Sequence, residues 1–492
     1  MGQSVTILFA IFIPIVLGVY LLARPAYKSR VSMVATASVG FAITTVFSLV
    51  ILIEGDLQLH LFSIGENMNI YFHVDDMSRV FGTIVTIVMP LVGIYAFEYM
   101  GHYKEEKRFF GFFLMVYGVL LALTYAGNLV TFYLFYELMS LSSVPLVFHF
   151  RSREAIMAGL KYLFYSLCGA YFVLFGMYFL NQYTTTLEFL PGGSLDMSKV
   201  AGNEGLLLLV AMSMIIGFGV KAGMVPLHAW LPNAHPIAPA PASAALSSLI
   251  VKMGVFGVMR VVYYLFGATF LRGTWVQYTW ITLTLITVFF GSMMAYREKV
   301  FKKRLAYSTV SQVSYILFGM ALLQPQALTG SILHIMFHAI IKSALFMSAG
   351  TIIYKTGVER VDEMRGIGKK MPKIMWSFTL CALALIGIPP ASGFISKWYL
   401  ATGSLASGLP VISWLGPVVL LISALLTAGY LLPIAIDGFF PGSDYDYEHL
   451  EKTEPTKQML VPIMILAALA VLLGVFPNMV LSYVSELVAL VL

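Results

Sequence analysis

The sequence predicts an all-α integral membrane protein with about fourteen transmembrane helices, and three observations lead to this prediction. The first is composition: of 492 residues, 59% are hydrophobic and only 11% are charged, whereas a soluble globular chain has about 45–50% apolar and about 25% charged residues. The second is a series of apolar segments that each approach the ~20 residues needed to span a bilayer. The third is the distribution of basic residues between those segments. This composition excludes a soluble enzyme, a disordered chain and a nucleic-acid-binding protein.

The apolar segments are predicted to be helices because a helix satisfies its own backbone hydrogen bonds in lipid. Polar or glycine-containing connections separate them. We place the spans at residues 4–23, 31–53, 77–99, 109–126, 128–149, 156–181, 205–225, 240–267, 275–295, 304–323, 328–354, 373–397, 411–436 and 459–488.

Basic residues gather in every second connection. If the N-terminus lies outside the cell, the cytoplasmic connections contain 21 of the 30 Lys and Arg residues, and the outward connections contain Lys199 and Arg272, with Arg79 at the edge of a span. Cytoplasmic enrichment of Lys and Arg is the usual topology signal of membrane proteins. The net charge of +6 is therefore explained by topology, with no nucleic-acid partner, and both termini are predicted to lie outside.

Residues 437–458 depart from this pattern because they contain six acidic residues and two lysines. Two interpretations stay open for this acidic cytoplasmic loop. It is either a solvated connection or a docking surface for a cytoplasmic partner.

A separate group of charged residues lies inside the predicted spans. A charged side chain at a helix centre costs about 2.5–3.5 kcal/mol on insertion scales, so such groups persist only where they face one another, polar backbone or water. Intramembrane charges normally mark an ion path or a proton relay, and the alternative is a long basic side chain that reaches the interface. That alternative is strongest for Lys161 and Arg260, which lie near helix ends. The group comprises Glu137, Lys161, Lys221, Lys252, Arg260, Lys342 and Lys397, together with His334 and His338.

Two of these lysines belong to helices that Gly and Pro interrupt. Lys221 is followed by Pro226, and Lys397 is preceded by Pro389 and Pro390. Proline removes a backbone hydrogen bond, and the freed carbonyl groups can then contact water or ions. Broken helices at corresponding positions of two halves indicate a transport site near the middle of the membrane.

The spacing of these residues indicates an internal repeat. Lys221 and Lys397 are 176 residues apart, and Lys161 and His338 are 177 residues apart. An odd number of helices in each unit would invert the second copy in the membrane. We therefore divide the chain into three N-terminal helices (1–108), a first five-helix repeat (109–267), a second, inverted five-helix repeat (275–436), the acidic loop (437–458) and a last helix (459–492).

Lysines and histidines accompanied by a single acid suit proton transfer. Burial favours a neutral lysine, whereas a nearby carboxylate favours the ammonium form. A change in the distance between Glu137 and Lys221 would therefore switch Lys221 between keeping and releasing a proton.

His334 and His338 are four residues apart on one helix face, and Lys342 follows one turn later. The pair lacks a third metal ligand, so a proton relay is favoured over a metal site. Cys168 and Cys381 are isolated and offer no zinc or iron–sulfur ligand set. We expect no metal and no cofactor in this chain.

Five stretches resemble the antiporter-like subunits shared by respiratory complex I, membrane-bound hydrogenases and Mrp-type cation/proton antiporters. The stretches are spread over residues 127–397, and together they are highly specific for that family. They are GNLVTFYLFYE (127–137), KAGMVPLHAWLPNAHP (221–236), KMGVFG (252–257), HIMFHAIIK (334–342) and GIPPASGFISK (387–397).

The resemblance implies a fourteen-helix core with two inverted five-helix repeats and a central hydrophilic axis. It implies that Glu137 pairs with Lys221, and that charge then passes through Lys252 and the histidine helix to Lys397. Some members have Lys at the last position and others have Glu, so Lys397 does not settle the subfamily. With 492 residues, the chain is expected to lack the long lateral helix of the largest complex I member.

From this resemblance we expect a proton-translocating membrane subunit of a multisubunit energy-converting complex in a prokaryotic cell membrane, with Na+ as the alternative coupling ion. Its partners would be other membrane subunits, lipid and, in a hydrogenase- or complex I-type assembly, cytoplasmic redox subunits that carry iron–sulfur clusters or a nickel–iron site. The stretch 234–244 favours that type over an Mrp-type Na+/H+ antiporter subunit, which is the alternative. A stand-alone solute carrier is more distant, because basic groups spread over several helices favour a relay over one substrate pocket.

Overall fold

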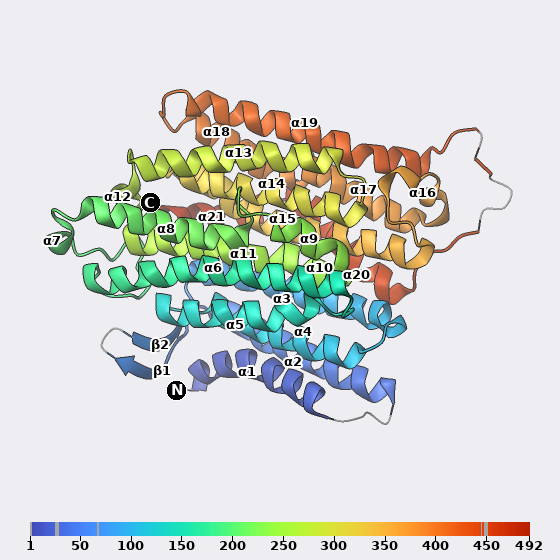
Figure 1. Ribbon diagram of the computed structural model, residues 1–492, viewed down its shortest axis with the longest axis horizontal. Coiled ribbons are helices and arrows are strands. Elements are labelled where there is room, and N and C mark those ends of the chain that lie inside the picture. The colour runs from blue at the N-terminus through green and yellow to red at the C-terminus, as the bar shows by residue number, and fades with distance from the viewer. Residues whose placement is uncertain (1, 25–28, 66–67, 444, 447–450) are drawn as a thin grey trace.

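The computed structural model describes residues 2–24, 29–65, 68–443, 445–446 and 451–492, which form a bundle of helices lying side by side (Figure 1). One β-hairpin, β1 (Gln58–Gly65) and β2 (Met68–His73), lies at one end of the bundle. The α-helices are α1 (Gly2–Ala23), α2 (Arg30–Glu54), α3 (Asp76–Tyr99), α4 (Glu106–Thr124), α5 (Leu129–Val147), α6 (Arg153–Tyr183), α7 (Met197–Val200), α8 (Glu204–Ala222), α9 (Trp230–Ile237), α10 (Ala240–Ala245), α11 (Val251–Met259), α12 (Ala268–Leu271), α13 (Trp275–Arg297), α14 (Phe301–Ala321), α15 (Pro325–Thr356), α16 (Ile367–Lys370), α17 (Pro372–Ile386), α18 (Ser392–Leu405), α19 (Ile412–Phe439), α20 (Lys457–Val475) and α21 (Asn478–Val491). Short 3-10 segments are η1 (Met100–His102) and η4 (Val361–Glu363), and π-helical segments are η2 (Leu246–Ile250) and η3 (Arg260–Phe266).

The predicted all-α membrane fold is confirmed. Within the described residues, twelve helices or continuous helical stretches are long and apolar enough to cross a membrane. The other two predicted spans do not meet this criterion. The span at 304–323 corresponds to α14, which is more polar, and the span at 373–397 is divided between α17 and α18. The count of fourteen crossings therefore stays a prediction.

One connection and one predicted span differ from the sequence prediction. The sequence predicted no structure for residues 58–65 and 68–73. These two segments pair as antiparallel strands with Gln58 opposite His73, because their Ile and aromatic residues favour strands. The last predicted span, 459–488, is interrupted at Phe476 and Pro477. Proline lacks the N–H that a continuous helix would need there.

The acidic loop is shorter than predicted. Helix α19 continues through Phe439, so Asp437 lies in a helix and the connection to α20 comprises residues 440–456. Two of its acidic positions, 444 and 448, lie outside the described residues.

Both predicted broken helices are present. Helix α8 is capped by Gly223 (φ 78°), and α17 is capped by Gly387 (φ 94°); glycine adopts this left-handed conformation without steric cost. In Figure 1 the chain passes from α8 at the left to α9 at the right, but from α17 at the right to α18 at the left. The two broken helices therefore run in opposite directions, as an inverted repeat requires.

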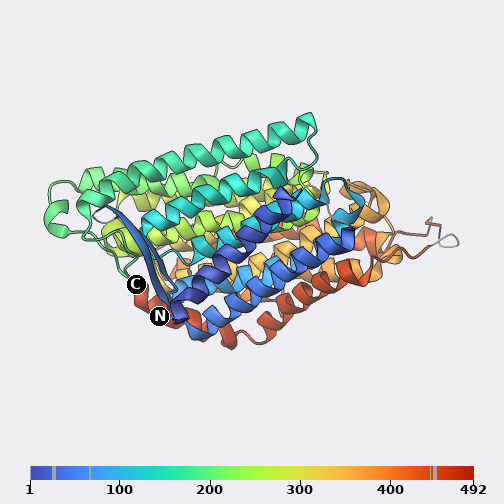
Figure 2. The ribbon, with the colours of Figure 1, turned by 90° about the horizontal axis from the view of Figure 1, so that it is seen from below.

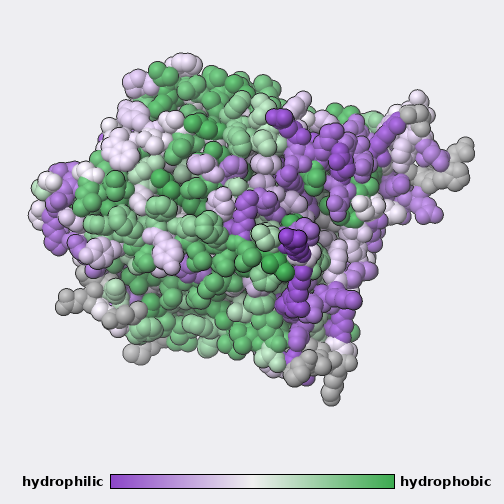
Figure 3. Space-filling view, in the orientation of Figure 1, coloured by the Kyte–Doolittle hydropathy of each residue, from purple (hydrophilic) through white to green (hydrophobic). Residues whose placement is uncertain are grey.

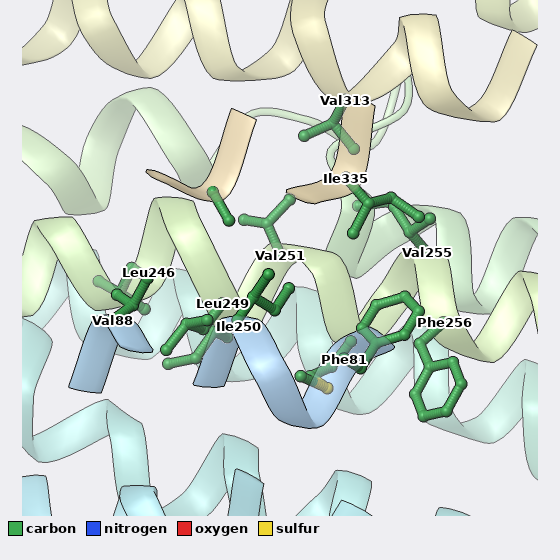
Figure 4. Close-up of a cluster of buried hydrophobic side chains, with 14 of the residues drawn as sticks. Phe81, Val88, Leu246, Leu249, Ile250, Val251, Val255, Phe256, Val313 and Ile335 are labelled. Carbon is green, nitrogen blue, oxygen red and sulfur yellow. The ribbon is translucent and has the colours of Figure 1, made fainter. Parts of the chain in front are cut away.

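A continuous helix over residues 240–266 lies at the centre of the bundle together with α15. In each of them the apolar stretch that could cross a membrane is entirely buried. Figure 4 shows apolar side chains of this helix, such as Leu249 and Phe256, packed between α3 on one side and Val313 and Ile335 on the other. A Cβ at Gly254 would lie 2.7 Å from the carbonyl oxygen of Phe218. Glycine is therefore needed for the close approach of α11 to α8.

The two ends of the bundle differ. Figures 1 and 2 place both termini at the end that carries the β-hairpin. Figure 3 shows the larger area of hydrophilic side chains at the opposite end and a smaller group at the α7 end, whereas hydrophobic side chains cover most of the middle of the surface. Termini at one common end agree with the predicted even number of crossings.

Candidate functional site

Lys221 lies in the last turn of α8, directly before the first helix break. Its side chain is buried, and its ammonium group donates hydrogen bonds to Ser140 Oγ at 2.8 Å, to Ser166 Oγ at 2.7 Å and to the Tyr162 hydroxyl at 3.1 Å. The Tyr162 ring also faces the ammonium, 4.4 Å from ring centroid to Nζ. All three N–H groups are thus paired inside the protein, as a charge buried in a membrane requires.

Glu137 lies on α5, one turn before Ser140, and is half-buried. Its Oε1 atom is buried and has no hydrogen-bond partner among the described residues. The ammonium of Lys221 donates its hydrogen bonds to hydroxyl groups, so it interacts with Glu137 at longer range. The structure brings the two charges into one site without the direct pairing that the resemblance implies.

Lys161 precedes Tyr162 on α6 but is only half-buried. Neighbouring side chains on a helix point about 100° apart, so Lys161 does not share the direction of Tyr162 toward Lys221. It lies within electrostatic range of His228 in the first break. The structure therefore leaves Lys161 outside the hydrogen-bonded cluster around Lys221.

Lys252 and Lys342 are fully buried at the centre of the bundle. Lys252 donates a hydrogen bond to the carbonyl oxygen of Ser247 at 2.6 Å, which belongs to the π-helical segment η2. Lys342 donates to the carbonyl oxygen of Leu305 at 2.8 Å and to the Ser308 hydroxyl. Single turns of π-helix inside α-helices are frequent at functional sites.

His334 and His338 lie on one face of α15, with ring centroids 5.8 Å apart. Nδ1 of His334 lies 2.8 Å from Ser396 Oγ, and its Nε2 lies 3.1 Å from Oε1 of Gln312. Both ring nitrogens of His338 are buried and have no hydrogen-bond partner among the described residues. Lys252 and Lys342 both lie within electrostatic range of that ring.

Lys397 lies on α18, beyond the second helix break. Its ammonium group donates hydrogen bonds to the carbonyl oxygens of Leu385 at 2.7 Å and Ile386 at 3.0 Å, where α17 ends. It also faces the ring of Tyr315 at 4.9 Å from the centroid. Tyr315 stacks on His334 with centroids 5.7 Å apart, and this stacking connects Lys397 to the histidine pair.

These buried titratable groups and the half-buried Glu137 thus form a series across the bundle between the two breaks. Pro226 marks the first break, and Pro389 and Pro390 mark the second. In order, the series contains Glu137, Lys221, Lys252 with Lys342, His338, His334 and Lys397.

The sequence left open whether Arg260 extends toward the membrane interface; in the structure its side chain is buried and pairs with Asp75, which lies in the connection before α3. Arg260 is fully buried and forms two hydrogen bonds with the carboxylate of Asp75, at 2.5 and 2.7 Å. Burial alone would raise the pKa of Asp75, but the Arg260 guanidinium holds the pKa of that carboxyl below its usual value. This ion pair joins the N-terminal end of α3 to η3.

The hydroxyl and amide groups of the site were not predicted. Ser140, Ser166, Ser308, Ser396 and Gln312 contact its charged or histidine side chains. The sequence prediction was based on charges only. A search for Ser, Thr, Tyr and Gln within the same spans could have identified them, because buried charges need hydrogen-bond partners.

Within the part of the chain that the structure describes, no group of three His, Cys, Asp or Glu side chains is placed to bind a metal ion. Cys168 and Cys381 are unpaired and belong to different helices. The chemistry that these groups support is proton exchange among lysine, histidine and carboxylate side chains.

Comparison with known proteins decides the family. The profile described as "NADH:quinone oxidoreductase/Mrp antiporter, TM" matches residues 126–436, which is more than half of the chain. The chain belongs to this family. A second profile, "NADH-Ubiquinone oxidoreductase (complex I), chain 5 N-terminus", matches residues 60–110. The resemblance found from the sequence motifs is therefore confirmed.

Members from different complexes are similar to this chain. NADH-quinone oxidoreductase subunit N of Desulforudis audaxviator is 33% identical over 81% of this chain and 81% of its own length. A Na(+)/H(+) antiporter subunit of Bacillus subtilis is 29% identical over 98% of this chain and 96% of its own length. Hydrogenase-4 component B of Escherichia coli is 30% identical over 83% of this chain and 63% of its own length.

Chains of two solved membrane complexes have the same fold. A chain of the Mrp complex from Dietzia sp. DQ12-45-1b superposes with a TM-score of 0.84 over all of this chain and 98% of that chain, at 20% identity. A chain of an archaeal membrane-bound sulfane sulfur reductase superposes with a TM-score of 0.83 over the whole length of both chains, at 21% identity. The predicted antiporter-like membrane fold is confirmed by both.

Proposed function

We propose that this chain is the proton-translocating membrane subunit of a multisubunit energy-converting complex in a prokaryotic cell membrane. The observation that carries the proposal is the series of buried titratable groups between the two helix breaks. Its lysines and histidines are buried in the bundle and Glu137 is half-buried, and intramembrane lysine, histidine and carboxylate groups are retained chiefly where ions or protons move.

In this proposal Glu137 and Lys221 form the first exchange site. Lys252 and Lys342, with His338 and His334, pass the proton through the centre, and Lys397 releases it beyond the second break. Lys161 supports the first site from its edge. The chain offers no redox group in this scheme, so iron–sulfur clusters or a nickel–iron site would belong to partner subunits. Both termini would lie on the outer side, because the hydrophilic end opposite them carries the basic connections.

An Mrp-type Na+/H+ antiporter subunit is the second candidate. It is favoured by the antiporter relative from Bacillus subtilis, whose similarity covers 98% of this chain. In that case the partners would be membrane subunits alone, and Na+ would be the second ion. Mass spectrometry of the complex purified in mild detergent distinguishes the two, because only the first assembly contains redox subunits.

A stand-alone solute carrier is less well supported. An open groove of about 740 Å³ on the outer face of α6 and α8 is lined by exposed apolar side chains that include Tyr171, Phe175 and Leu209. None of the buried titratable groups lines it. A carrier for a charged organic substrate would place its charged groups around such a space.

The test is Lys221→Ala in the assembled complex, with proton uptake measured in inverted membrane vesicles. We expect a loss of about 100-fold or more, the scale on which a positioned proton-transfer group contributes. Lys355→Ala, which removes a lysine at the hydrophilic end, is the matched control and should transport normally. Unchanged proton uptake by the assembled Lys221→Ala complex would overturn the proposal.

A further inference from the structure

Arg79 is a charged residue that neither the series of titratable groups nor the Arg260–Asp75 ion pair uses. It lies in the first turn of α3, at the end of the bundle that carries both termini (Figure 1), and its side chain is 35% exposed. Among the described residues its only side-chain hydrogen bond is a long one, 3.4 Å to Oδ1 of Asp76. A guanidinium has five N–H donors, so most donors of Arg79 are left for a ligand.

Two neighbours hold the guanidinium of Arg79 in place. Its Cζ atom lies over the ring of Tyr483 on α21, 5.5 Å from the centroid. It also lies next to Gly55, the cap of α2, where an added Cβ would be 3.6 Å from Cζ. The Tyr483 hydroxyl donates to Asp76, whose carbonyl oxygen and Oδ1 atom lie 3.0 and 3.1 Å away. Arg79, Asp76 and Tyr483 thus form one polar group that contains a positive and a negative charge.

This polar group borders a pocket of about 230 Å³ between α2, α3, α15 and α21. Arg79 and Tyr483 belong to the pocket wall, and Met479 in the same wall is 79% exposed. The pocket is therefore at the surface of the bundle and not in its interior. Its remaining walls are mostly apolar and consist of Leu52, Val80, Thr83, Met336, Met479 and Val480.

The pocket connects the lipid-facing surface with the central helix α15. Leu52 lies in its wall, and the next residue on α2, Ile53, is 81% exposed. At the inner side, Met336 is the one partly exposed residue of α15 from Ala327 to Ile352, all of which the structure describes. An apolar chain in this pocket would therefore contact the helix that carries the histidine pair.

We propose that this pocket binds one membrane phospholipid whose head group carries both a phosphate and a primary ammonium, as in phosphatidylethanolamine. Arg79 donates to the phosphate, since guanidinium–phosphate hydrogen bonds are charge-assisted and can be bidentate. Asp76 accepts from the ammonium, and an acyl chain fills the apolar part of the pocket. This lipid site goes beyond the proposed function and does not depend on it.

The two charges of the site select this head group. The phosphate of phosphatidylglycerol would pair with Arg79 but would bring a negative charge close to Asp76 with no cation to offset it. The quaternary ammonium of phosphatidylcholine has no N–H group to donate. Among the described residues, hydrogen bonds reach only Oδ1 of the Asp76 side chain, and a carboxylate can accept about four. A soluble phosphate would leave the apolar walls of the pocket unfilled.

The first test counts the lipids that stay on the assembled complex. The complex is purified in mild detergent, stripped of loosely bound lipid and exposed to mixed micelles that contain equal amounts of phosphatidylethanolamine, phosphatidylglycerol and phosphatidylcholine. Native mass spectrometry then counts each bound lipid. For Arg79→Gln we expect about tenfold lower occupancy of one phosphatidylethanolamine, the scale of a charge-assisted hydrogen bond, with the other two lipids unchanged. Asp76→Asn should abolish the preference for phosphatidylethanolamine over phosphatidylglycerol.

Arg272→Gln is the matched control for these charges. Arg272 lies at the same end of the bundle, but its guanidinium donates to the carbonyl oxygen of Leu323 at 2.8 Å. This variant should retain every lipid that the wild type retains. Equal occupancy of phosphatidylethanolamine in the wild type and Arg79→Gln would overturn the proposal, and so would a loss of phosphatidylglycerol in its place.

The second test fills the pocket and leaves its charges intact. Thr83→Trp should cause the same loss of one phosphatidylethanolamine, because the indole would occupy the space of the acyl chain. Thr282→Trp is the matched control: both threonines bond to the carbonyl oxygen four residues earlier, but Thr282 lines a groove on α13 that contains no charged side chain. Thr282→Trp should keep the lipid. Wild-type occupancy in an assembled Thr83→Trp complex would overturn the proposed site.

Discussion

The two broken helices each contain a buried lysine, and the ammonium groups of the two lysines have different hydrogen-bond partners. Lys221 at the first break donates to the hydroxyl groups of Ser140, Tyr162 and Ser166. Lys397 at the second break donates to two main-chain carbonyl groups, those of Leu385 and Ile386. Both ammonium groups also face a tyrosine ring. The difference lies in whether side chains or backbone satisfy the charge.

This difference has a chemical consequence. A hydroxyl group can accept a hydrogen bond from an ammonium and can also donate one to the lone pair of a neutral amine, whereas a carbonyl group only accepts. The surroundings of Lys221 therefore suit both protonation states, and those of Lys397 suit the charged state best. The hydroxyl groups at the first break therefore fit proton exchange at Lys221, whereas the carbonyl groups at the second break fit an ammonium that keeps its proton.

The same distinction applies to stability. Some charged side chains are paired with one oppositely charged side chain, and others donate hydrogen bonds only to backbone carbonyl groups. We expect the larger loss of stability when a charge of the first kind is removed. Arg260→Met leaves the largely buried Asp75 carboxylate without its cation, so we expect the free energy of unfolding to fall by about 3–5 kcal/mol. Lys397→Met leaves only carbonyl groups behind and should cost less, about 1–2 kcal/mol. Unfolding in mixed detergent micelles measures both.

A double variant provides the control for this prediction. Arg260→Met combined with Asp75→Asn removes both charges and should recover part of the lost stability. An Arg260→Met protein as stable as the wild type would show that the pair is not what joins α3 to η3.

A second prediction concerns the loss of stability at low pH that is caused by His149, in the connection after α5. Burial, followed by the charge of Arg108, lowers the pKa of His149 to about 4. The unfolded chain, with a pKa of about 6.5, then binds more protons than the folded chain, so stability is complete above pH 6.5 and is lost as the pH falls toward 4. The loss between pH 7 and pH 4 should be about 3 kcal/mol.

The second half lacks such a group, because the connection between α14 and α15 consists of Leu322, Leu323 and Gln324. Thermal unfolding in detergent at pH 7, 5.5 and 4 is the measurement. His149→Gln should reduce the acid sensitivity, and His102→Gln, at an exposed histidine, should not. Equal acid sensitivity of wild type and His149→Gln would contradict the prediction.

The smallest effect is expected from the hydroxyl groups themselves. Ser140→Ala with Ser166→Ala removes two of the three hydrogen bonds of Lys221, and we expect proton uptake to fall by about tenfold, equivalent to ~1.4 kcal/mol. Ser343→Ala is the matched control, because Ser343 lies 177 residues after Ser166 but bonds only to the carbonyl oxygen of Ala339. Equal effects of the two changes would mean that the hydroxyl groups near Lys221 have no special role.

Much of the fold could be predicted because it depends on local sequence. Hydropathy predicts the apolar spans, and helix-breaking residues predict the two breaks at Gly223 and Gly387. The charge distribution predicts that both termini lie at the same end. The β-hairpin and the interruption at Pro477 were missed. A strand of Ile and aromatic residues is hard to separate from an apolar loop, and one proline does not always end a helix.

The charged residues of the candidate site were predicted from the sequence, but their hydrogen-bond and ion-pair partners were not. Glu137, Lys221, Lys252 and Lys397 were found because ionisable groups within apolar spans are costly. Asp75 was overlooked, since it lies in a connection and is near Arg260 only in the folded chain.

What the sequence determined by itself is which ionisable groups enter the membrane and where the helices break. These are properties of single residues and short segments, because the cost of burying a charge and the missing N–H of proline do not depend on distant parts of the chain. Only the tertiary structure decided how each charge is satisfied. Ser140 is 81 residues from Lys221 and Asp75 is 185 residues from Arg260, so helix packing, and not local sequence, brings each partner into hydrogen-bonding distance.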